Sequence, residues 1–283
     1  DSGDGIKEPL LDVSTFSPTL VATSGGNAAP VASFTQTCSS LTCTFTDTST
    51  DADGTIAAVT PGAAKAPSGG IALPAMPNVH SHAHQRLMLG LAERAGPGAD
   101  SFWTWRDIMY RFANHVGPDE LEAIAALAYV EMVEAGFAQV GEFHYVHHDR
   151  DGTPFADPAE MGARLVAAAQ EAGIGLTLLP VLYMTAGFGG VPPRAEQRRF
   201  IHDIDGYARL IEASRRAVAG VPDAVVGVAP HSLRAVSPTG LAAALEIGAG
   251  GPVHIHIAEQ TAEVDDCLGF TGQRPVEIGR AHV

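Results

Sequence analysis

Lysine is almost absent from this sequence of 283 residues, in which Lys7 and Lys65 are the two examples. Arginine supplies the remaining positive charge, and acidic residues outnumber basic ones by 32 to 17, giving a formal net charge of −15. Nucleic acids and anionic membrane surfaces attract positive proteins, so this balance argues against both as partners. Arginine suits two-point recognition of carboxylates, so an acidic small molecule would be held by a few local arginines.

Long apolar runs are also lacking: none approaches the roughly 18 residues that a membrane span needs. The first residues contain no basic segment followed by an apolar one, so we expect no signal peptide and no membrane partner. Hydrophobic residues make up 46% and charged residues 17% of the chain, which is typical of a globular protein of one large or two modest domains.

Cysteine is scarce, and its three positions differ in character. Cys267 lies in a predicted helix and is expected to be a buried or half-buried thiol. Cys38 and Cys43 lie close together in a Ser/Thr-rich stretch, as in a small extracellular disulfide. The stretch Asn27–Ile56 resembles the first half of a PKD domain, a small β-sandwich often appended to secreted proteases, through APVASF, these cysteines and FTDTSTDADGTI.

We therefore predict a PKD-like partial β-segment over residues 1–60, with strands at Val31–Phe34 and Cys43–Thr46, and a linker over residues 61–70. Half a sandwich cannot bury its sheet face, so we expect this segment to be poorly ordered or wrongly paired. Taken alone, it would indicate a secreted binding module.

From residue 71 onwards, apolar strand patterns alternate with amphipathic helix patterns, which predicts an α/β fold with a parallel sheet. A complete (β/α)8 TIM-type barrel takes about 250 residues, so about five β/α units indicate a partial one over residues 71–277. The predicted strands are Ile71–His80, Phe137–Tyr145, Ile174–Tyr183, Ala224–His231 and Val253–Ile257. The predicted helices are Pro118–Ala135, Pro158–Ala172, Ala195–Ala219 and Pro238–Ile247.

Polar residues gather at the carboxyl ends of these strands, which form the catalytic face of such barrels. His80 and His82 close the first strand, and alternate residues of a strand point the same way, so both can reach one metal ion. A second such pair, His254 and His256, closes another strand. Two histidines from one strand and one from the other would form the three-ligand open site of a catalytic zinc.

Glu259 follows the second pair by three residues. A carboxylate beside a metal site can take a proton from water and pass it to a leaving nitrogen. The plain alternative is a solvated glutamate at the start of a helix, but the motif around it favours the proton shuttle.

Five longer motifs together resemble the formimidoylglutamate deiminases of the amidohydrolase superfamily, enzymes of bacterial histidine degradation. The resemblance runs from Ile71 to Glu277, with His84 standing where the family usually has an aromatic residue. The motifs are PNVHSHAHQRLMLGLAE, DSFWTWRDIMYR, VGEFHYVHH, APHSLRAV and PVHIHIAEQTAEVDDC.

The resemblance implies one Zn²⁺ per chain, held by His80, His82 and His256, with Glu259 as the proton shuttle. It also implies a set of residues that bind an acidic small-molecule substrate: Gln85, Arg106, Tyr145, His231 and Arg234. The implied reaction is hydrolytic deimination of N-formimidoyl-L-glutamate to N-formyl-L-glutamate and ammonia. The residues themselves agree in part, because Arg234 at a strand end and Arg106 beside two tryptophans are candidate carboxylate clamps. Tyr145 could donate a hydrogen bond to a carboxylate.

The remaining histidines are not predicted to bind the metal ion or the substrate. His144, His147 and His148 are predicted on the surface or in a layer behind the site, and His115 and His202 on helix surfaces.

The family also supplies a histidine from its sixth strand and a metal-binding aspartate from its eighth, which have no counterpart here. Residues 278–283, IGRAHV, depart from the family pattern and are predicted to be a non-native tail of a truncated or chimeric gene product. We therefore expect impaired deiminase activity.

Two alternatives remain open: another deaminase of the superfamily, acting on guanine, cytosine or a related base, and the secreted binding module. The barrel part is expected to be cytoplasmic, and a homodimer is left open.

Overall fold

The computed structural model describes residues 34–39, 42–47, 75–91 and 102–280. The chain divides into two units, Asp1–Pro74 and Ala75–Val283. In the first unit, β1 (Phe34–Ser39) and β2 (Thr42–Asp47) form an antiparallel hairpin with Cys38 opposite Cys43. The predicted strand Cys43–Thr46 falls within β2. Most of the other predicted strand, the linker and residues 281–283 lie outside the described residues, and the PKD resemblance stays a prediction.

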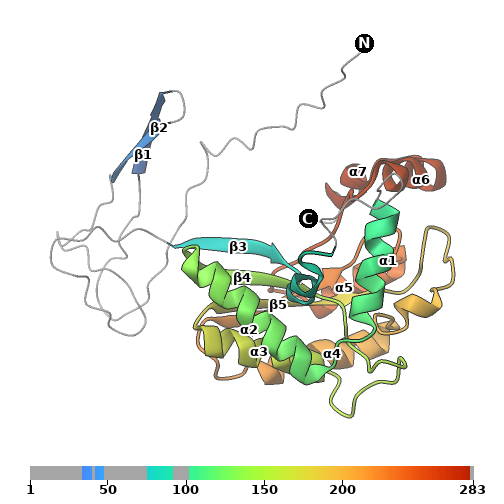
Figure 1. The fold of residues 1–283 in the computed structure, drawn as a ribbon. Coiled ribbons are helices and arrows are strands. Elements are labelled where there is room, and N and C mark those ends of the chain that lie inside the picture. Colours follow the sequence, from blue (N-terminus) through green and yellow to red (C-terminus); the bar gives the residue numbers. More distant parts are fainter. Residues whose placement is uncertain (1–33, 40–41, 48–74, 92–101, 281–283) are drawn as a thin grey trace. The chain divides into compact units, whose positions relative to one another are not determined.

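The second unit is built on a parallel sheet whose strands are neighbours in the order of the chain (Figure 1). Its strands are β3 (Met76–Ser81), β4 (Phe137–His144), β5 (Gly175–Leu182), and β6 (Ala224–Val226) and β7 (Ala229–Pro230), which both pair with β5. The predicted α/β fold with a partial barrel is therefore confirmed. Within the described residues the sheet does not close, and β3 forms its edge, with Met76 57% and Val79 65% exposed.

Helices connect the strands and cover the sheet, with α2 and α3 running along it in Figure 1. No described helix combines the length and the apolar character that a membrane-crossing segment needs. The helices are η2 (Ala83–Met88), α1 (Phe102–Ala113), α2 (Pro118–Glu134), α3 (Glu160–Ala172), η3 (Ala195–Gln197), α4 (Ile204–Ala217), α5 (Pro238–Ile247), α6 (Thr261–Thr271) and α7 (Pro275–Arg280).

Helix α4 shows how local sequence sets these elements. It begins after Asp203, whose carboxylate accepts a hydrogen bond from the backbone N–H of Gly206 at 2.7 Å. Its apolar residues recur every three or four positions, and the buried face they form includes Tyr207, Leu210 and Ile211. The hydroxyl of Tyr207 donates to the carbonyl of Pro180 at 2.9 Å, which attaches the helix to β5.

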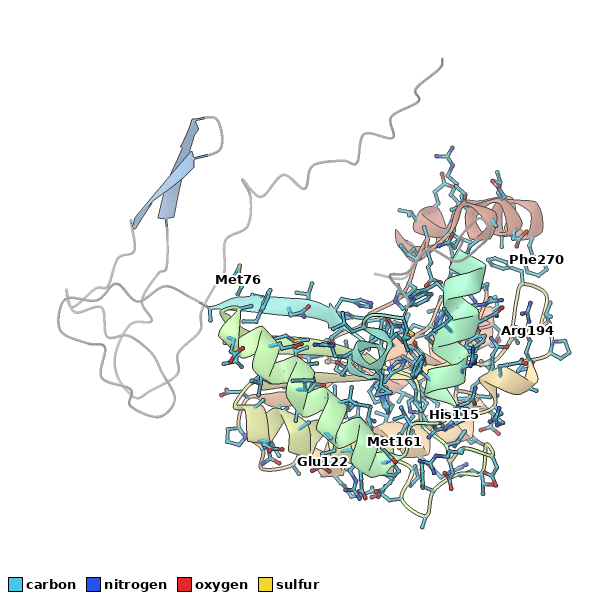
Figure 2. The ribbon with its side chains drawn as sticks, in the orientation of Figure 1. Met76, His115, Glu122, Met161, Arg194 and Phe270 are labelled. Carbon is cyan, nitrogen blue, oxygen red and sulfur yellow. The ribbon has the colours of Figure 1, made fainter. Side chains whose placement is uncertain are left out.

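Buried side chains fill the space between sheet and helices (Figure 2). Strands β4 and β5 lie in the middle of the sheet and are buried along most of their length, as expected for parallel strands covered by helices. Phe143 and Met161 are fully buried in this core, and Cys267 of α6 is fully buried as predicted.

Two predicted elements differ from the structure. Val253–Ile257 is not a continuous strand, although His254 and His256 still donate backbone hydrogen bonds to the carbonyls of Val228 and His231. Ala195–Ala219 is divided into η3 and α4, because the backbone N–H of His202 bonds instead to the carbonyl of Tyr183 beside β5. Helix α1 was not predicted.

The prediction of a surface position was wrong for His202, whereas His144, His147 and His148 were predicted either on the surface or behind the site, and their burial excludes the surface. His144, His147, His148 and His202 are all buried, and the rings of His147 and His202 lie 5.0 Å apart. Burial lowers the pKa of His144 to about 3, and neither of its ring nitrogens has a hydrogen-bond partner among the described residues. These histidines are therefore neutral in the folded protein at physiological pH.

This burial predicts a loss of stability in acid. Because the pKa of His144 is lowered from about 6.5, the unfolded chain binds a proton that the folded chain does not between pH 6.5 and about 3. The free energy of unfolding should fall through this window, by about 1.4 kcal/mol per pH unit for such a histidine. His144→Phe should gain on the order of 2 kcal/mol relative to wild type between pH 7 and pH 5, measured by urea unfolding. Equal pH dependence in both proteins would contradict the prediction, and exposed His115→Gln is the control.

Candidate metal and substrate pocket

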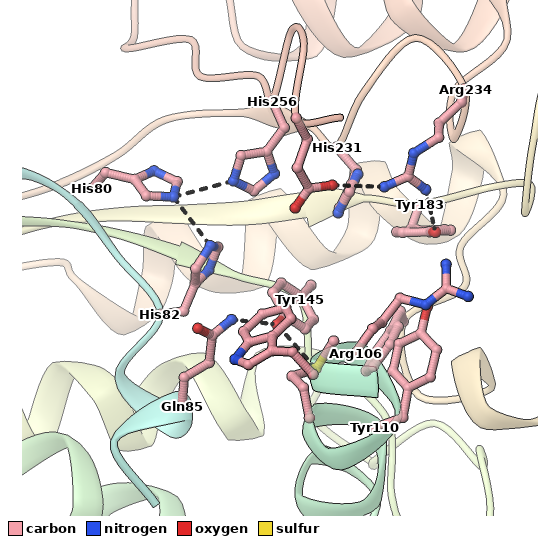
Figure 3. A pocket seen from close by; sticks show the side chains of 14 residues that line it. His80, His82, Gln85, Arg106, Tyr110, Tyr145, Tyr183, His231, Arg234 and His256 are labelled. Carbon is pink, nitrogen blue, oxygen red and sulfur yellow. Dashed lines mark hydrogen bonds and ion pairs between the residues drawn. The ribbon is translucent and has the colours of Figure 1, made fainter. Parts of the chain in front are cut away.

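All nine predicted site residues line a single pocket of about 260 Å³ at the carboxyl ends of the strands. Their convergence comes from the sheet, because parallel strands end on the same side. Figure 3 shows histidines at one end of this pocket and arginine and tyrosine side chains at the other.

His80, His82 and His256 form the histidine end. The first two come from the end of β3 and the residue after it, and His256 comes from a segment 174 positions further along the chain than His82. The Nε2 atom of His80 lies 3.1 Å from the Nε2 atoms of both other rings. Histidine, cysteine and acidic side chains are the common protein ligands of metal ions. Among such side chains in the described residues, His80, His82 and His256 form the group that could hold an ion, because their ligand atoms all lie within 4.8 Å of one another.

The chemistry of these rings fits a cation. Nδ1 of His82 lies 2.8 Å from the carbonyl oxygen of Phe143, so it carries the proton and donates it, leaving a lone pair on Nε2. The ligand atoms of the three rings lie within 4.8 Å of one another, so they are close enough to share one cation. Burial lowers the pKa of His82 to about 3 and that of His256 to about 4, which keeps both rings neutral and able to act as ligands.

Phe143, a residue that sequence analysis did not assign to the site, supports all three rings. Its ring centroid lies 4.3 Å from that of His256 and 5.4 Å from those of His80 and His82. It is fully buried, so it fixes the positions of the imidazoles on one side. The sequence signal for this role was its position in β4: side chains alternate along a strand, so Phe143 points to the opposite face from its neighbours Glu142 and His144.

Glu142 also lies at a strand end, but it is fully buried and does not line the pocket. Its Oε1 accepts a hydrogen bond from the backbone N–H of Ala83 at 2.7 Å, so it holds the turn that carries His82. Burial raises its pKa to about 6. His254, the other half of the second histidine pair, is likewise outside the pocket lining.

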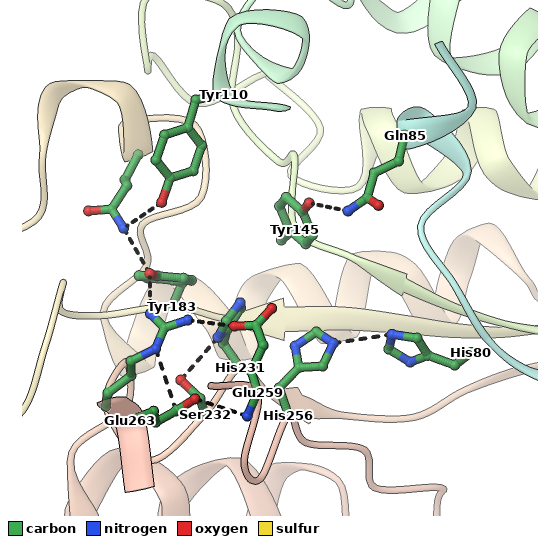
Figure 4. A network of polar contacts seen from close by, with 12 residues as sticks. His80, Gln85, Tyr110, Tyr145, Tyr183, His231, Ser232, His256, Glu259 and Glu263 are labelled. Carbon is green, nitrogen blue, oxygen red and sulfur yellow. Dashed lines mark hydrogen bonds and ion pairs between the residues drawn. The ribbon is translucent and has the colours of Figure 1, made fainter. Parts of the chain in front are cut away.

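Arg234 lies at the other end of the pocket (Figure 3), and its polar partners Tyr183, Glu259 and Glu263 belong to the network in Figure 4. Its Nη2 donates to Glu259 Oε2 at 2.9 Å, and its Nη1 donates to the hydroxyl of Tyr183 at 3.2 Å. Its Nε lies 3.4 Å from Glu263 Oε1. Glu263 is 5% exposed and also accepts from the backbone N–H of Glu259, so it fixes both the arginine and the candidate proton shuttle.

The wall between the two ends contains Tyr145, Gln85 and His231. The hydroxyl of Tyr145 accepts a hydrogen bond from Nε2 of Gln85 at 3.1 Å, and it also contacts Nε2 of His84 at 3.0 Å. Burial raises the pKa of Tyr145 well above its usual value, so the phenol keeps its proton. Burial lowers the pKa of His231, whose ring lies 5.1 Å from that of His256.

Arg106 reaches the pocket from α1, with its guanidinium 5.5 Å from the ring centroid of Tyr110. Gln197 of η3 donates hydrogen bonds to the hydroxyls of both Tyr110 and Tyr183, at 3.2 and 2.7 Å. None of Tyr110, Tyr183 and Gln197 was predicted in the site: Tyr110 lies in the unpredicted helix α1, Gln197 was expected within a long helix, and Tyr183, although it ends a predicted strand, was not singled out.

A parallel sheet with imidazoles converging at its carboxyl ends defines a protein of the (β/α)8 class whose histidines could hold a metal ion. The chain belongs to the Amidohydrolase family, whose model matches residues 71–278. It is 51% identical over 230 residues to a formimidoylglutamate deiminase of Pseudomonas aeruginosa, a match that covers 80% of this chain and 51% of that protein.

Solved structures give the same result for the fold. The chain is 56% identical to an amidohydrolase from Brucella melitensis, with a TM-score of 0.72, over 74% of this chain and 47% of that one. A zinc-bound adenosine deaminase from Xanthomonas campestris is 22% identical with a TM-score of 0.50, over 74% and 42% of the two chains, and shares the fold. This chain thus spans about half the length of the relatives it matches.

The histidine geometry predicts one metal site. The chain should bind about one zinc ion after dialysis, measured by plasma mass spectrometry, and His256→Ala should lower its affinity for zinc at least tenfold by removing a ligand. His115→Ala, which removes an exposed histidine, should bind zinc as wild type does. Full zinc affinity in His256→Ala, or an equal loss in His115→Ala, would show that the ion is bound elsewhere.

Proposed function

We propose that this pocket carries out zinc-dependent hydrolytic deimination of N-formimidoyl-L-glutamate, yielding N-formyl-L-glutamate and ammonia. The observation that carries the proposal is the division of the pocket into a three-histidine end and an end containing Arg106 and Arg234. A molecule with a hydrolysable C–N bond and two carboxylates matches both ends. The likeness to the P. aeruginosa deiminase supports this choice.

His80, His82 and His256 would hold the zinc ion. Bound zinc would act as a Lewis acid and make hydroxide available at neutral pH. Its supporting residues are already in place: Phe143 packs against the three rings, and its carbonyl fixes the tautomer of His82. The site therefore needs little rearrangement to bind a cation.

Glu259 is the candidate proton shuttle, and Arg234 determines its position in the absence of substrate. A carboxylate at this position can accept a proton from the attacking water. When a substrate carboxylate takes the guanidinium of Arg234, the side chain of Glu259 is released to protonate the departing nitrogen. Ammonia then leaves.

Arg234 and Arg106 would hold the substrate carboxylates, with Gln85, Tyr145 and His231 completing the wall. A neutral nucleobase offers no carboxylate to Arg234 or Arg106, so it gains nothing from the positive charge at this end of the pocket. This disfavours the alternative of a guanine or cytosine deaminase.

The remaining assignments stay proposals. They comprise the cytoplasmic location, a homodimer, the place in histidine degradation, the residue boundaries of the segments, and the secreted binding module of the first unit.

Turnover tests the assignment most simply. The zinc-loaded chain should release ammonia from N-formimidoyl-L-glutamate but not from guanine or cytosine, measured by a coupled ammonia assay. We expect slow turnover, because the described sheet does not close around the pocket and leaves His80 exposed. Glu259→Gln should lower the rate by about 10²- to 10⁴-fold, because the amide cannot shuttle a proton.

Glu259→Gln should still bind N-formyl-L-glutamate, since the substitution leaves Arg234 and Arg106 in place. Arg234→Ala should instead lose affinity for this dicarboxylate. Ammonia release from a nucleobase, or full activity of Glu259→Gln on the dicarboxylate substrate, would contradict the assignment.

A further inference from the structure

The orientation of the buried Gln197 amide is fixed by its surroundings. Its Oε1 accepts a hydrogen bond from the backbone N–H of Arg194 at 2.8 Å, a group that can only donate. Its Nε2 must therefore face the pocket side, where it donates one hydrogen to Tyr110 and the other to Tyr183. Gln197 is 2% exposed, so water does not compete for these bonds.

The hydroxyl oxygen of Tyr183 accepts two hydrogen bonds. Gln197 donates to its oxygen at 2.7 Å and Nη1 of Arg234 donates to it at 3.2 Å. A phenol oxygen has two lone pairs and one hydrogen, so both lone pairs are used and the hydrogen remains available. No described residue accepts a hydrogen bond from it, and Tyr183 lines the pocket.

The hydroxyl of Tyr110 has the same hydrogen-bonding role. Its hydroxyl accepts from Gln197, no described residue accepts from it, and it also lines the pocket. Burial raises its pKa to about 12, so it holds its hydrogen at neutral pH. Arg106 and Arg234, the groups beside these tyrosines, can only donate. The hydroxyl hydrogens of Tyr183 and Tyr110 are thus pocket-lining donors that no described residue accepts.

We propose that Tyr183 and Tyr110 are specificity-determining residues, whose hydroxyl hydrogens bind a substrate carboxylate beside Arg234 and Arg106. The proposal rests on the proposed function and adds to it. Gln197 fixes the direction of both hydroxyls without touching substrate, so it is a positioning residue. An arginine alone attracts any anion, whereas a guanidinium with two directed hydroxyls selects for the shape of a carboxylate.

The test compares three ligands by isothermal titration calorimetry with the zinc-loaded chain. N-formyl-L-glutamate carries both carboxylates, N-formyl-L-norvaline lacks the side-chain one, and 4-(formylamino)butanoate lacks the α one. Tyr183→Phe should bind N-formyl-L-glutamate roughly tenfold more weakly, the usual effect of one hydrogen bond to a charged group. Of the two single-carboxylate ligands, the one that keeps the carboxylate contacted by Tyr183 should lose the same amount of affinity. The other, which lacks that carboxylate, should lose less than twofold.

Equal weakening for all three ligands, or no weakening for any, would overturn the proposal. Tyr110→Phe should give the same pattern and serves as the second variant if Tyr183→Phe does not fold. Tyr207→Phe is the matched control: it removes a buried hydroxyl that bonds to β5 outside the pocket, so it should lower the melting temperature but leave all three affinities unchanged.

Wild-type protein separates this proposal from the proposed function. If wild type binds all three ligands equally, or binds none, the preference for a dicarboxylate is absent and both ideas fail. If wild type prefers N-formyl-L-glutamate and Tyr183→Phe keeps that full preference, the proposed function stands and the role of Tyr183 is wrong.

Discussion

The contact between the ends of β3 and β4 determines the position of the histidine site. Three consecutive residues of β4 make it. A side chain at Gly141 would begin 2.7 Å from the carbonyl oxygen of Val79, so glycine is what lets the two strands approach. Glu142 then holds the backbone of Ala83, and the carbonyl of Phe143 accepts a hydrogen bond from Nδ1 of His82. These three consecutive residues thus fix the strand backbone, the turn after it and the imidazole of His82. Only His256 comes from another part of the chain.

The other end of the pocket depends on charge. In a chain with net charge −15, a cationic pocket exists only where arginines are held locally. Glu263 and Glu259 hold Arg234, while Tyr183 contributes an uncharged partner. This arrangement keeps a guanidinium at a partly buried position, while its partner Glu259 is still 27% exposed.

Much of this was predictable from the sequence, for a physical reason. Strand periodicity located β4 and β5, and the positions of polar residues after the strands indicated which side chains would converge, including His80, His82 and Arg234. The sequence was less informative where chain geometry departs from regular elements. His256 reaches the site from a segment that is not a strand, and Tyr183 gains its role from Gln197, 14 residues away in a short 3-10 helix. Buried His144 and His202 have no periodic signal that separates them from surface histidines.

One metal ion is expected among three histidines from two distant parts of the chain. Diffraction data collected on both sides of the zinc absorption edge, from crystals of the zinc-loaded chain, test this directly. We expect one anomalous peak, about 2.0–2.1 Å from Nε2 of His80, His82 and His256. A peak among the buried rings of His144, His147 and His202, or no peak within bonding distance of His256, would contradict it.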